Sequence, residues 1–338
     1  MKHCFLPLLG ATIVGLCLPA MATTAAYEAE ARERFAIAES HLLKGNSQTA
    51  LEGFARIVSR FPLSPEAARA QLRIADATWR AGQTAEAFDA YQIFIDRFPQ
   101  SDEFTRAVQS QFVIARRQIA TARSIARTQG RGKTLRTLRE SGIIMLRKIL
   151  ASAKHAPFSA EAHYLLAVTL DENTDIDNGG RRESFAEFEK LIQTYPDHRY
   201  AAAAAFQLAF IPYRSSFKEY SYDQTELSKA RLAFEDFLSR YPNSERSPEA
   251  RYRLASIDKA QTNNAVRTAG FYHRTGYESA AAASYHEALK TSGTGTQTNS
   301  IREKLEHLSP AGEKPSSTSS LISPNDESNH IPATIIGL

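Results

Sequence analysis

Cysteine is nearly absent from this sequence. The only two cysteines, Cys4 and Cys17, lie close to the N-terminus, and none follows them in the remainder of the 338 residues. Residues 23–338 therefore contain neither a thiol nor a disulfide. This excludes cysteine catalysis and a disulfide-stapled fold for the mature protein.

Glycine, proline and tryptophan are also scarce, with 16, 14 and 1 residues respectively. This composition excludes collagen-like chains, and the frequent alanine and arginine residues suit helices. The formal net charge of +4 is too small to imply a polyanionic partner by itself. The one long apolar run covers residues 4–18, which is too short for a membrane-spanning helix.

Residues 1–22 have the three parts of a secretory signal peptide. A positively charged start, MKH, precedes the apolar run, and Ala20-Met21-Ala22 forms a small-x-small cleavage site. We therefore predict export, which in a bacterium would place the mature chain in the periplasm. Bacterial lipoprotein cysteines usually follow a small residue, but Leu16 precedes Cys17. We accordingly expect no lipid at Cys17.

One sequence motif occurs four times in clear form and organises the rest of the chain. The copies read ALEGFARIVSRFP, AFDAYQIFIDRFP, SFAEFEKLIQTYP and ARLAFEDFLSRYP, beginning at Ala50, Ala87, Ser184 and Ala230. Degenerate copies begin at Gly142 and Ala281. A motif that recurs at such intervals indicates a repeat array, in which each unit packs only on its neighbours.

The spacing of residues within the motif predicts a helix and the position at which it ends. A small residue followed by an aromatic at +4 and apolar residues at +7 and +8 lies on one helix face. The closing prolines cannot continue a helix. Gly45 and Gly82, five residues before the first two copies, suit tight turns with positive φ. Helix, glycine turn, helix and proline form the tetratricopeptide pattern; an ordinary bundle of similar helices is the alternative.

The predicted fold is therefore all-α, a tetratricopeptide-repeat superhelix (a right-handed α-solenoid) of about five to six helical hairpins. We expect N-terminal hairpins over residues 27–103, a long basic helical segment with a degenerate repeat over 104–157, and C-terminal hairpins over 158–291. The rich Gly, Ser, Thr and Pro content of 292–338 predicts a disordered tail. Within it, residues 301–308 could form one or two helical turns.

Basic residues accumulate in the middle segment. Between residues 106 and 154 there are twelve basic residues and one acidic residue, Glu140, which gives a local charge near +11. We expect a basic patch there, formed by Arg116, Arg117, Arg123, Arg127, Arg131, Lys133, Arg136 and Arg139. It would contact anionic lipid headgroups or an acidic partner, and a solvated face without a partner is the alternative. Nucleic acid is not expected as a partner of an exported protein.

Catalytic and metal-binding motifs are missing from the sequence. Gly132-Lys133-Thr134 resembles the end of a phosphate-binding loop, but Arg127 stands where the first glycine belongs. From Asp171 or Asp175, the calcium-loop spacing lacks its terminal glutamate. There is no HExxH and no GxSxG motif. We expect no enzyme activity, no cofactor and no metal.

We therefore expect the protein to bind its partners through the shape of the surface that its stacked hairpins form. Stacked hairpins expose the first helix of each pair on an inner face, where an apolar residue beside a charge suits an extended peptide. The candidate partner-binding residues on that face are Phe35, Glu39, Leu72, Asp76, Trp79 and Arg80. The alternative for Phe35, Leu72 and Trp79 is that they belong to the core between helices.

Three stretches resemble the BamD (ComL/YfiO-type) family. They are residues 35–101, beginning FAIAESHLLKGN and ending IDRFPQS; residues 219–254, EYSYDQTELSKARLAFEDFLSRYPNSERSPEARYRL; and residues 269–289, AGFYHRTGYESAAAASYHEAL. The resemblance implies a non-catalytic periplasmic scaffold of the machinery that assembles outer-membrane β-barrels. It implies two kinds of protein partner, the barrel insertase and unfolded barrel substrates. The alternative is a repeat adaptor of another envelope complex, such as Tol-Pal or cell-wall synthesis.

Overall fold

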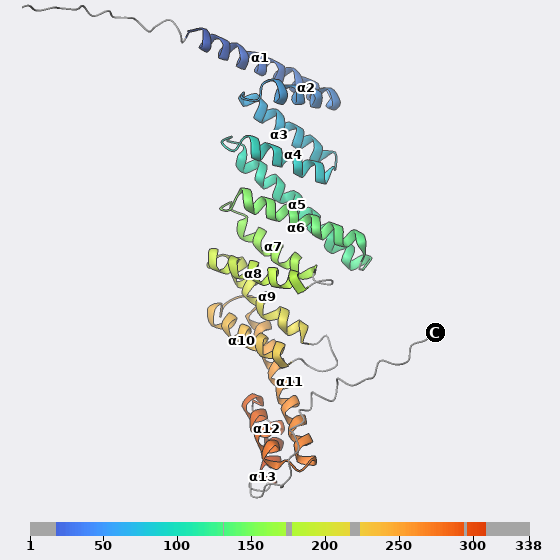
Figure 1. Ribbon diagram of the computed structural model, residues 1–338, viewed down its shortest axis with the longest axis vertical. Helices are drawn as coiled ribbons and strands as arrows, with labels where there is room; N and C mark the ends of the chain where they lie inside the picture. The colour runs from blue at the N-terminus through green and yellow to red at the C-terminus, as the bar shows by residue number, and fades with distance from the viewer. Residues whose placement is uncertain (1–17, 131, 174–177, 217–223, 294–295, 309–338) are drawn as a thin grey trace, which may run out of the picture. The chain divides into compact units, whose positions relative to one another are not determined.

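The computed structural model describes residues 18–130, 132–173, 178–216, 224–293 and 296–308. These residues form thirteen helices and no strand (Figure 1). They divide into two compact units, Met1–Tyr200 and Ala201–Leu338. Each unit is built from antiparallel helix pairs.

The first unit contains four helix pairs. Their helices are α1 (Leu18–Leu43) with α2 (Ser47–Arg60), α3 (Pro65–Arg80) with α4 (Thr84–Arg97), α5 (Phe104–Thr128) with α6 (Lys133–Ser152), and α7 (Ser159–Glu172) with α8 (Asn178–Thr194). The second helix of each of the first three pairs also packs on the next pair, so α2 contacts α3, α4 contacts α5, and α6 contacts α7. Neighbour-to-neighbour packing of this kind is the defining feature of a solenoid.

The second unit contains two further pairs and a closing helix. They are α9 (Arg199–Ser215), whose first two residues belong to the first unit, α10 (Gln224–Arg240), α11 (Ser247–Arg274), α12 (Glu278–Thr291) and α13 (Thr296–Glu306). Phe206 on α9 packs edge-on against Phe234 and Phe237 on α10. The long helix α11 packs on both α10 and α12, and therefore serves two neighbours.

Residues of the repeated motif make the contacts between helices, as predicted. Its small first residues are fully buried in the clear copies and in the copy at Ala281, namely Ala50, Ala87, Ser184, Ala230 and Ala281. In the copy at Gly142, an added Cβ would lie 2.9 Å from Cγ1 of Ile119 on α5. A larger residue would therefore push α5 and α6 apart. The four helices that carry clear copies each end two residues before the closing proline.

Two glycine turns also have the predicted backbone geometry. Gly45 and Gly82 have φ of 81° and 79°, the left-handed region in which a side chain is strained. Each lies between the two helices of a pair and allows the chain to reverse within a few residues. Six pairs in the described residues agree with the five to six hairpins expected. The prediction of an all-α tetratricopeptide-repeat solenoid is confirmed.

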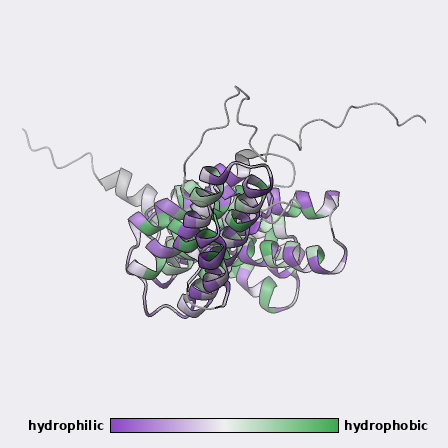
Figure 2. Cartoon of the chain, turned by 90° about the horizontal axis from the view of Figure 1, so that it is seen from below, coloured by the Kyte–Doolittle hydropathy of each residue, from purple (hydrophilic) through white to green (hydrophobic). Residues whose placement is uncertain are grey.

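The core of the first unit runs through consecutive pairs. Phe94 on α4, Ile119 on α5 and Leu146 on α6 belong to one buried cluster that extends from α3 to α7. Figure 2 shows hydrophobic and hydrophilic residues alternating along individual helices. This amphipathic pattern lets each helix bury one side on its neighbours.

Part of the segment expected to be a disordered tail is helical in the structure, around the place where one or two helical turns were expected over residues 301–308. Residues 296–306 form α13, and Ile301 and Leu308 are buried against the last hairpin together with half-buried Leu305. Their spacing of four and three residues places them on one helix face. Burial of that face against α11 and α12 offsets the low intrinsic order of the segment. Residues 309–338 lie outside the described residues.

Candidate protein-binding surface

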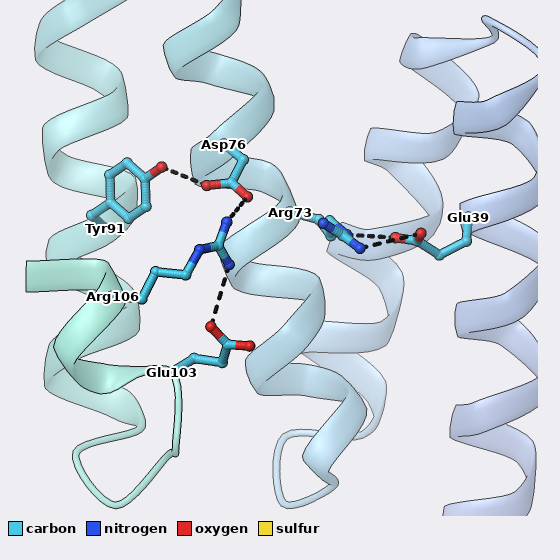
Figure 3. Close-up of polar contacts among 6 residues, drawn as sticks. All are labelled: Glu39, Arg73, Asp76, Tyr91, Glu103 and Arg106. Carbon is cyan, nitrogen blue, oxygen red and sulfur yellow. Dashed lines mark hydrogen bonds and ion pairs between the residues drawn. The ribbon is translucent and has the colours of Figure 1, made fainter. Parts of the chain in front are cut away.

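The first helices of consecutive pairs are tied together by ion pairs. Arg32 and Arg106 are exposed, whereas their partner carboxylates Glu66 and Asp76 are buried. Three pairs join α1 to α3 and α3 to α5: Arg32–Glu66 at 3.7 Å, Arg73–Glu39 at 2.6 Å and Arg106–Asp76 at 2.6 Å. Figure 3 shows the Arg73–Glu39 and Arg106–Asp76 pairs. These contacts bring one side of α1, α3 and α5 together as a continuous surface.

Asp76 is the centre of the tightest part of this network. Its carboxylate accepts a hydrogen bond from the Tyr91 hydroxyl at 2.5 Å and one from Arg106 at 2.6 Å. Burial, helped by the hydrogen bond and negative charge of Asp76, raises the pKa of Tyr91 well above its ordinary value. Burial of the Arg106 guanidinium opposes its charged form, but the bond to Asp76 outweighs this and raises the pKa of Arg106.

Trp79 lies at the junction of α3 and α5. Its ring is half-buried against the core of the first unit, and the guanidinium carbon of Arg117 lies 5.2 Å from the ring centre. Arg80, the next residue, is exposed. Aromatic residues and arginine are both enriched at protein-binding surfaces.

We define the A-helix face as the exposed residues that lie beside these contacts. Arg69 and Arg80 share one side of α3 with Arg73 and Asp76, because their spacing of four, three and four residues follows the helix period. Val113 and Arg117 share one side of α5 with Arg106. The face comprises Arg69, Arg80, Val113 and Arg117. Among the described residues, no acidic side chain pairs with Arg69, Arg80 or Arg117.

The structure places the six predicted partner-binding residues in different environments. Leu72 is buried in the core, and Phe35 is half-buried with its ring 5.5 Å from that of Phe54. Glu39 and Asp76 are engaged in ion pairs within the chain. Of the six, only Arg80 is exposed, and Trp79 beside it is half-buried. Core packing, the alternative considered from the sequence, therefore accounts for Leu72.

The sequence did not indicate that Arg69, Val113 and Arg117 lie on one surface. The spacing of the arginines on α3 was a usable signal, since Arg69, Arg73 and Arg80 recur at helical intervals. The position of α5 beside them was not visible in the sequence. It depends on the Asp76–Arg106 and Trp79–Arg117 contacts between two helices.

The predicted basic patch is divided by acidic partners from other helices. Arg116 pairs with Glu161 on α7 at 3.2 Å, and Arg123 and Arg139 both approach Glu172 at the end of α7. Those partners lie outside the segment counted in the sequence, so the linear charge near +11 overstates the local field. Arg131 lies outside the described residues. The exposed cations that remain without an acidic partner in the described residues are Arg117, Arg127 and Lys133.

Metal and membrane features are not found in the described part of the chain. No group of three histidine, cysteine, aspartate or glutamate side chains there is placed to hold a metal ion. No helix among the same residues combines the length and the apolar character that crossing a membrane requires.

Two solved structures that the chain is similar to are of tetratricopeptide-repeat proteins. A thermophilic repeat protein from Thermus thermophilus is 17% identical, covers 67% of this chain and 98% of its own, and gives a TM-score of 0.32. A repeat protein from Parabacteroides merdae is 14% identical over 82% of this chain and 97% of its own, also with a TM-score of 0.32. No curated protein sequence matches the chain.

A family match covers more than half of the sequence. The model of the YfiO family, described as outer membrane lipoprotein, matches residues 27–221. The match begins just after the predicted signal peptide and includes the whole A-helix face. It ends between α9 and α10, and the resemblance of the chain beyond residue 221 stays a prediction. The chain thus belongs to the YfiO family of outer membrane lipoproteins, as its sequence resemblance to the BamD (ComL/YfiO-type) proteins predicted.

Proposed function

We propose that the protein is a non-catalytic, exported scaffold of the machinery that assembles outer-membrane β-barrels. In this proposal the A-helix face binds segments of unfolded barrel substrates, and other parts of the solenoid dock on the barrel insertase. Family membership and the repeat fold support the scaffold role. The observation that carries the binding role is the set of arginines Arg69, Arg80 and Arg117, without acidic partners in the described residues, beside exposed Val113.

This surface suits an extended peptide that ends in a carboxylate. A guanidinium binds a carboxylate through two parallel hydrogen bonds, and none of these three arginines has an acidic partner among the described residues. Exposed Val113 and half-buried Trp79 offer apolar contacts for the side chains that precede the peptide end. Charge and apolar contact together favour a short amphipathic segment over a folded partner.

The direct test is binding of a synthetic peptide with alternating apolar residues, once with a free C-terminal carboxylate and once amidated. We expect Arg69→Gln with Arg80→Gln to weaken the carboxylate form roughly tenfold or more, since a charge-assisted hydrogen bond contributes about 1.5–3 kcal/mol. Lys44→Gln with Arg251→Gln is the matched control, because both residues are exposed and lie off this face. Equal binding of the two peptides would contradict the carboxylate part of the proposal.

We also propose that the mature protein resides in the periplasm, at the inner face of the outer membrane, without a lipid on Cys17. Cys17 lies outside the described residues, and α1 begins at Leu18, inside the predicted signal peptide. Cleavage after Ala22 would leave most of α1 intact. Mass spectrometry of the protein recovered from cell envelopes decides the matter: an unmodified N-terminus at Thr23 supports the proposal, and a lipid-modified Cys17 overturns it.

An adaptor role in another envelope complex, such as Tol-Pal or cell-wall synthesis, is the second candidate, because the repeat fold is common to many scaffolds. Recovery of the tagged protein from gently solubilised envelopes separates the two. Co-recovery of an outer-membrane barrel with periplasmic domains supports the assembly role. Recovery of Tol-Pal or cell-wall proteins alone would favour the adaptor.

A further inference from the structure

The α5–α6 hairpin is longer than the pair before it. Helix α5 has 25 residues and α6 has 20, compared with 16 and 14 in α3 and α4. The first two copies of the repeat, at Ala50 and Ala87, are 37 residues apart. The same interval places Arg117 of α5 at the position that corresponds to Arg80, the last residue of α3. Helix α5 therefore continues for about 16 Å beyond the point where α3 ends in its own repeat. Figure 1 shows both helices extending past the ends of α3 and α4.

We call residues 124–130 and 132–138 the hairpin tip. This stretch contains no aspartate or glutamate, and its basic side chains Arg127, Lys133 and Arg136 are all exposed. Among the described residues, Arg127 donates only to the backbone carbonyl of Arg123, at 3.3 Å. Lys133 has no acidic partner among the described residues. Arg136 lies 3.6 Å from Glu140 in an exposed pair, which neutralises it only weakly.

The acidic group at the base of the tip is already occupied. Glu172, at the end of α7, lies 3.0 Å from Arg123 and 3.9 Å from Arg139. One carboxylate is therefore shared by two cations below the tip. The positive charge of Arg127, Lys133 and Arg136 is left uncompensated by this carboxylate.

The surroundings of these cations indicate the kind of partner. No large apolar side chain of the tip is exposed among its described residues. A protein interface normally has an apolar, often aromatic centre. An anionic lipid surface requires only accessible positive charge that can approach a plane. A protruding tip with cations and hydroxyl-bearing threonines meets the second requirement and not the first.

We propose that the tip of the α5–α6 hairpin binds an anionic phospholipid surface through Arg127, Lys133 and Arg136. The ligand groups are the phosphates of lipid headgroups, and the contact is electrostatic and peripheral, with no insertion into the hydrocarbon. The A-helix face consists of different residues, so lipid binding by the tip can be tested independently of peptide binding. Such a contact would orient the scaffold on a membrane without a lipid anchor.

The test measures binding of the mature chain, from Thr23 onward, to vesicles of phosphatidylglycerol and to vesicles of phosphatidylcholine. We expect binding to the anionic vesicles only, and weakening by salt. The triple variant Arg127→Gln, Lys133→Gln, Arg136→Gln should bind about a hundredfold less tightly, because each cation near an anionic surface contributes about a factor of five.

Two control variants separate the tip from net charge and from folding. Lys44→Gln, Arg251→Gln, Lys259→Gln removes the same charge from exposed positions outside the tip and should retain binding. Arg127→Lys with Arg136→Lys keeps the tip charge and should bind nearly as well as the parent. The proposal is overturned if the tip variant and the charge control lose binding equally. It is also overturned if the parent binds neither vesicle, or if inorganic phosphate displaces the protein more than sodium chloride of equal ionic strength does.

Discussion

The guanidinium of Arg117 on α5 lies over the indole ring of Trp79 on α3, 5.2 Å from the ring centre. The contact connects the first helices of consecutive repeats at the edge of the A-helix face. It joins a side chain that packs on the core to one that faces solvent. Trp79 is therefore expected to contribute to stability and Arg117 mainly to the surface charge, a division that mutations can test.

Trp79→Ala should lower the free energy of unfolding by about 2 kcal/mol, because the half-buried ring leaves a cavity against the core. Arg80→Ala should change it by no more than about 0.5 kcal/mol, since the side chain is exposed. Urea unfolding followed by circular dichroism measures both. Unchanged stability in Trp79→Ala, combined with lost peptide binding, would instead place the ring in the binding surface.

Tyr91→Phe should make the protein less sensitive to alkali. The pKa of Tyr91 is raised in the folded state by burial and by Asp76. A raised folded pKa means that its stabilising contribution is complete below the unfolded value near 10 and is lost as the pH rises above it. At neutral pH the variant should lose about 1 kcal/mol with the hydrogen bond to Asp76.

Urea midpoints at neutral pH and above pH 10 would check this alkaline effect. Tyr252→Phe is the matched control, because Tyr252 is 67% exposed and should leave the alkaline limb unchanged. A parallel loss of stability in the parent and in Tyr91→Phe above pH 10 would show that Tyr91 does not govern the alkaline response.

Glu187→Gln should flatten the acid side of the stability curve. Burial of Glu187 opposes its charged form, but the hydrogen bond with His163 at 2.8 Å and nearby positive charge outweigh this and lower the Glu187 pKa. A lowered folded pKa gives stability that is present above the unfolded value near 4.5 and is lost as the pH falls through the folded one.

We expect Glu187→Gln to be about 1 kcal/mol less stable than the parent near pH 6, with the difference shrinking towards low pH. Thermal unfolding across the acid range measures the trend. Glu303→Gln serves as a control, because that carboxylate is exposed on α13. A constant difference at all acid pH values would show that the effect is steric and not linked to the carboxylate charge.

Gly82→Ala should destabilise the α3–α4 hairpin by about 1 kcal/mol, because Gly82 has φ of 79° and a side chain is strained there. Gly132→Ala is a close control at the next hairpin turn. Gly132 has φ of −177°, an extended conformation open to any residue, and an added Cβ meets nothing within 4 Å. Equal losses in the two variants, measured by thermal unfolding, would contradict the backbone explanation.

The sequence determined the repeat architecture because its signals are local. Alanine four residues before an aromatic, glycine at a turn with positive φ and proline after the helix each act within one hairpin. Ala50, Gly82 and Pro99 could therefore be interpreted from their neighbours in the chain. The same local logic indicated one or two helical turns over residues 301–308 but not their burial, because Ile301, Leu305 and Leu308 pack on the last hairpin, which is distant from them in local sequence pattern.

The candidate surface depended on tertiary structure because its residues come from different helices. Asp76 and Glu39 appeared free in the sequence, but Arg106 and Arg73 from neighbouring helices bind them. The basic segment appeared uniform, but Glu161 and Glu172 on α7 neutralise its base. Net charge along a chain is fixed by sequence, whereas the field at a surface depends on which charges lie within a few ångströms. Only the packing of consecutive repeats decided that.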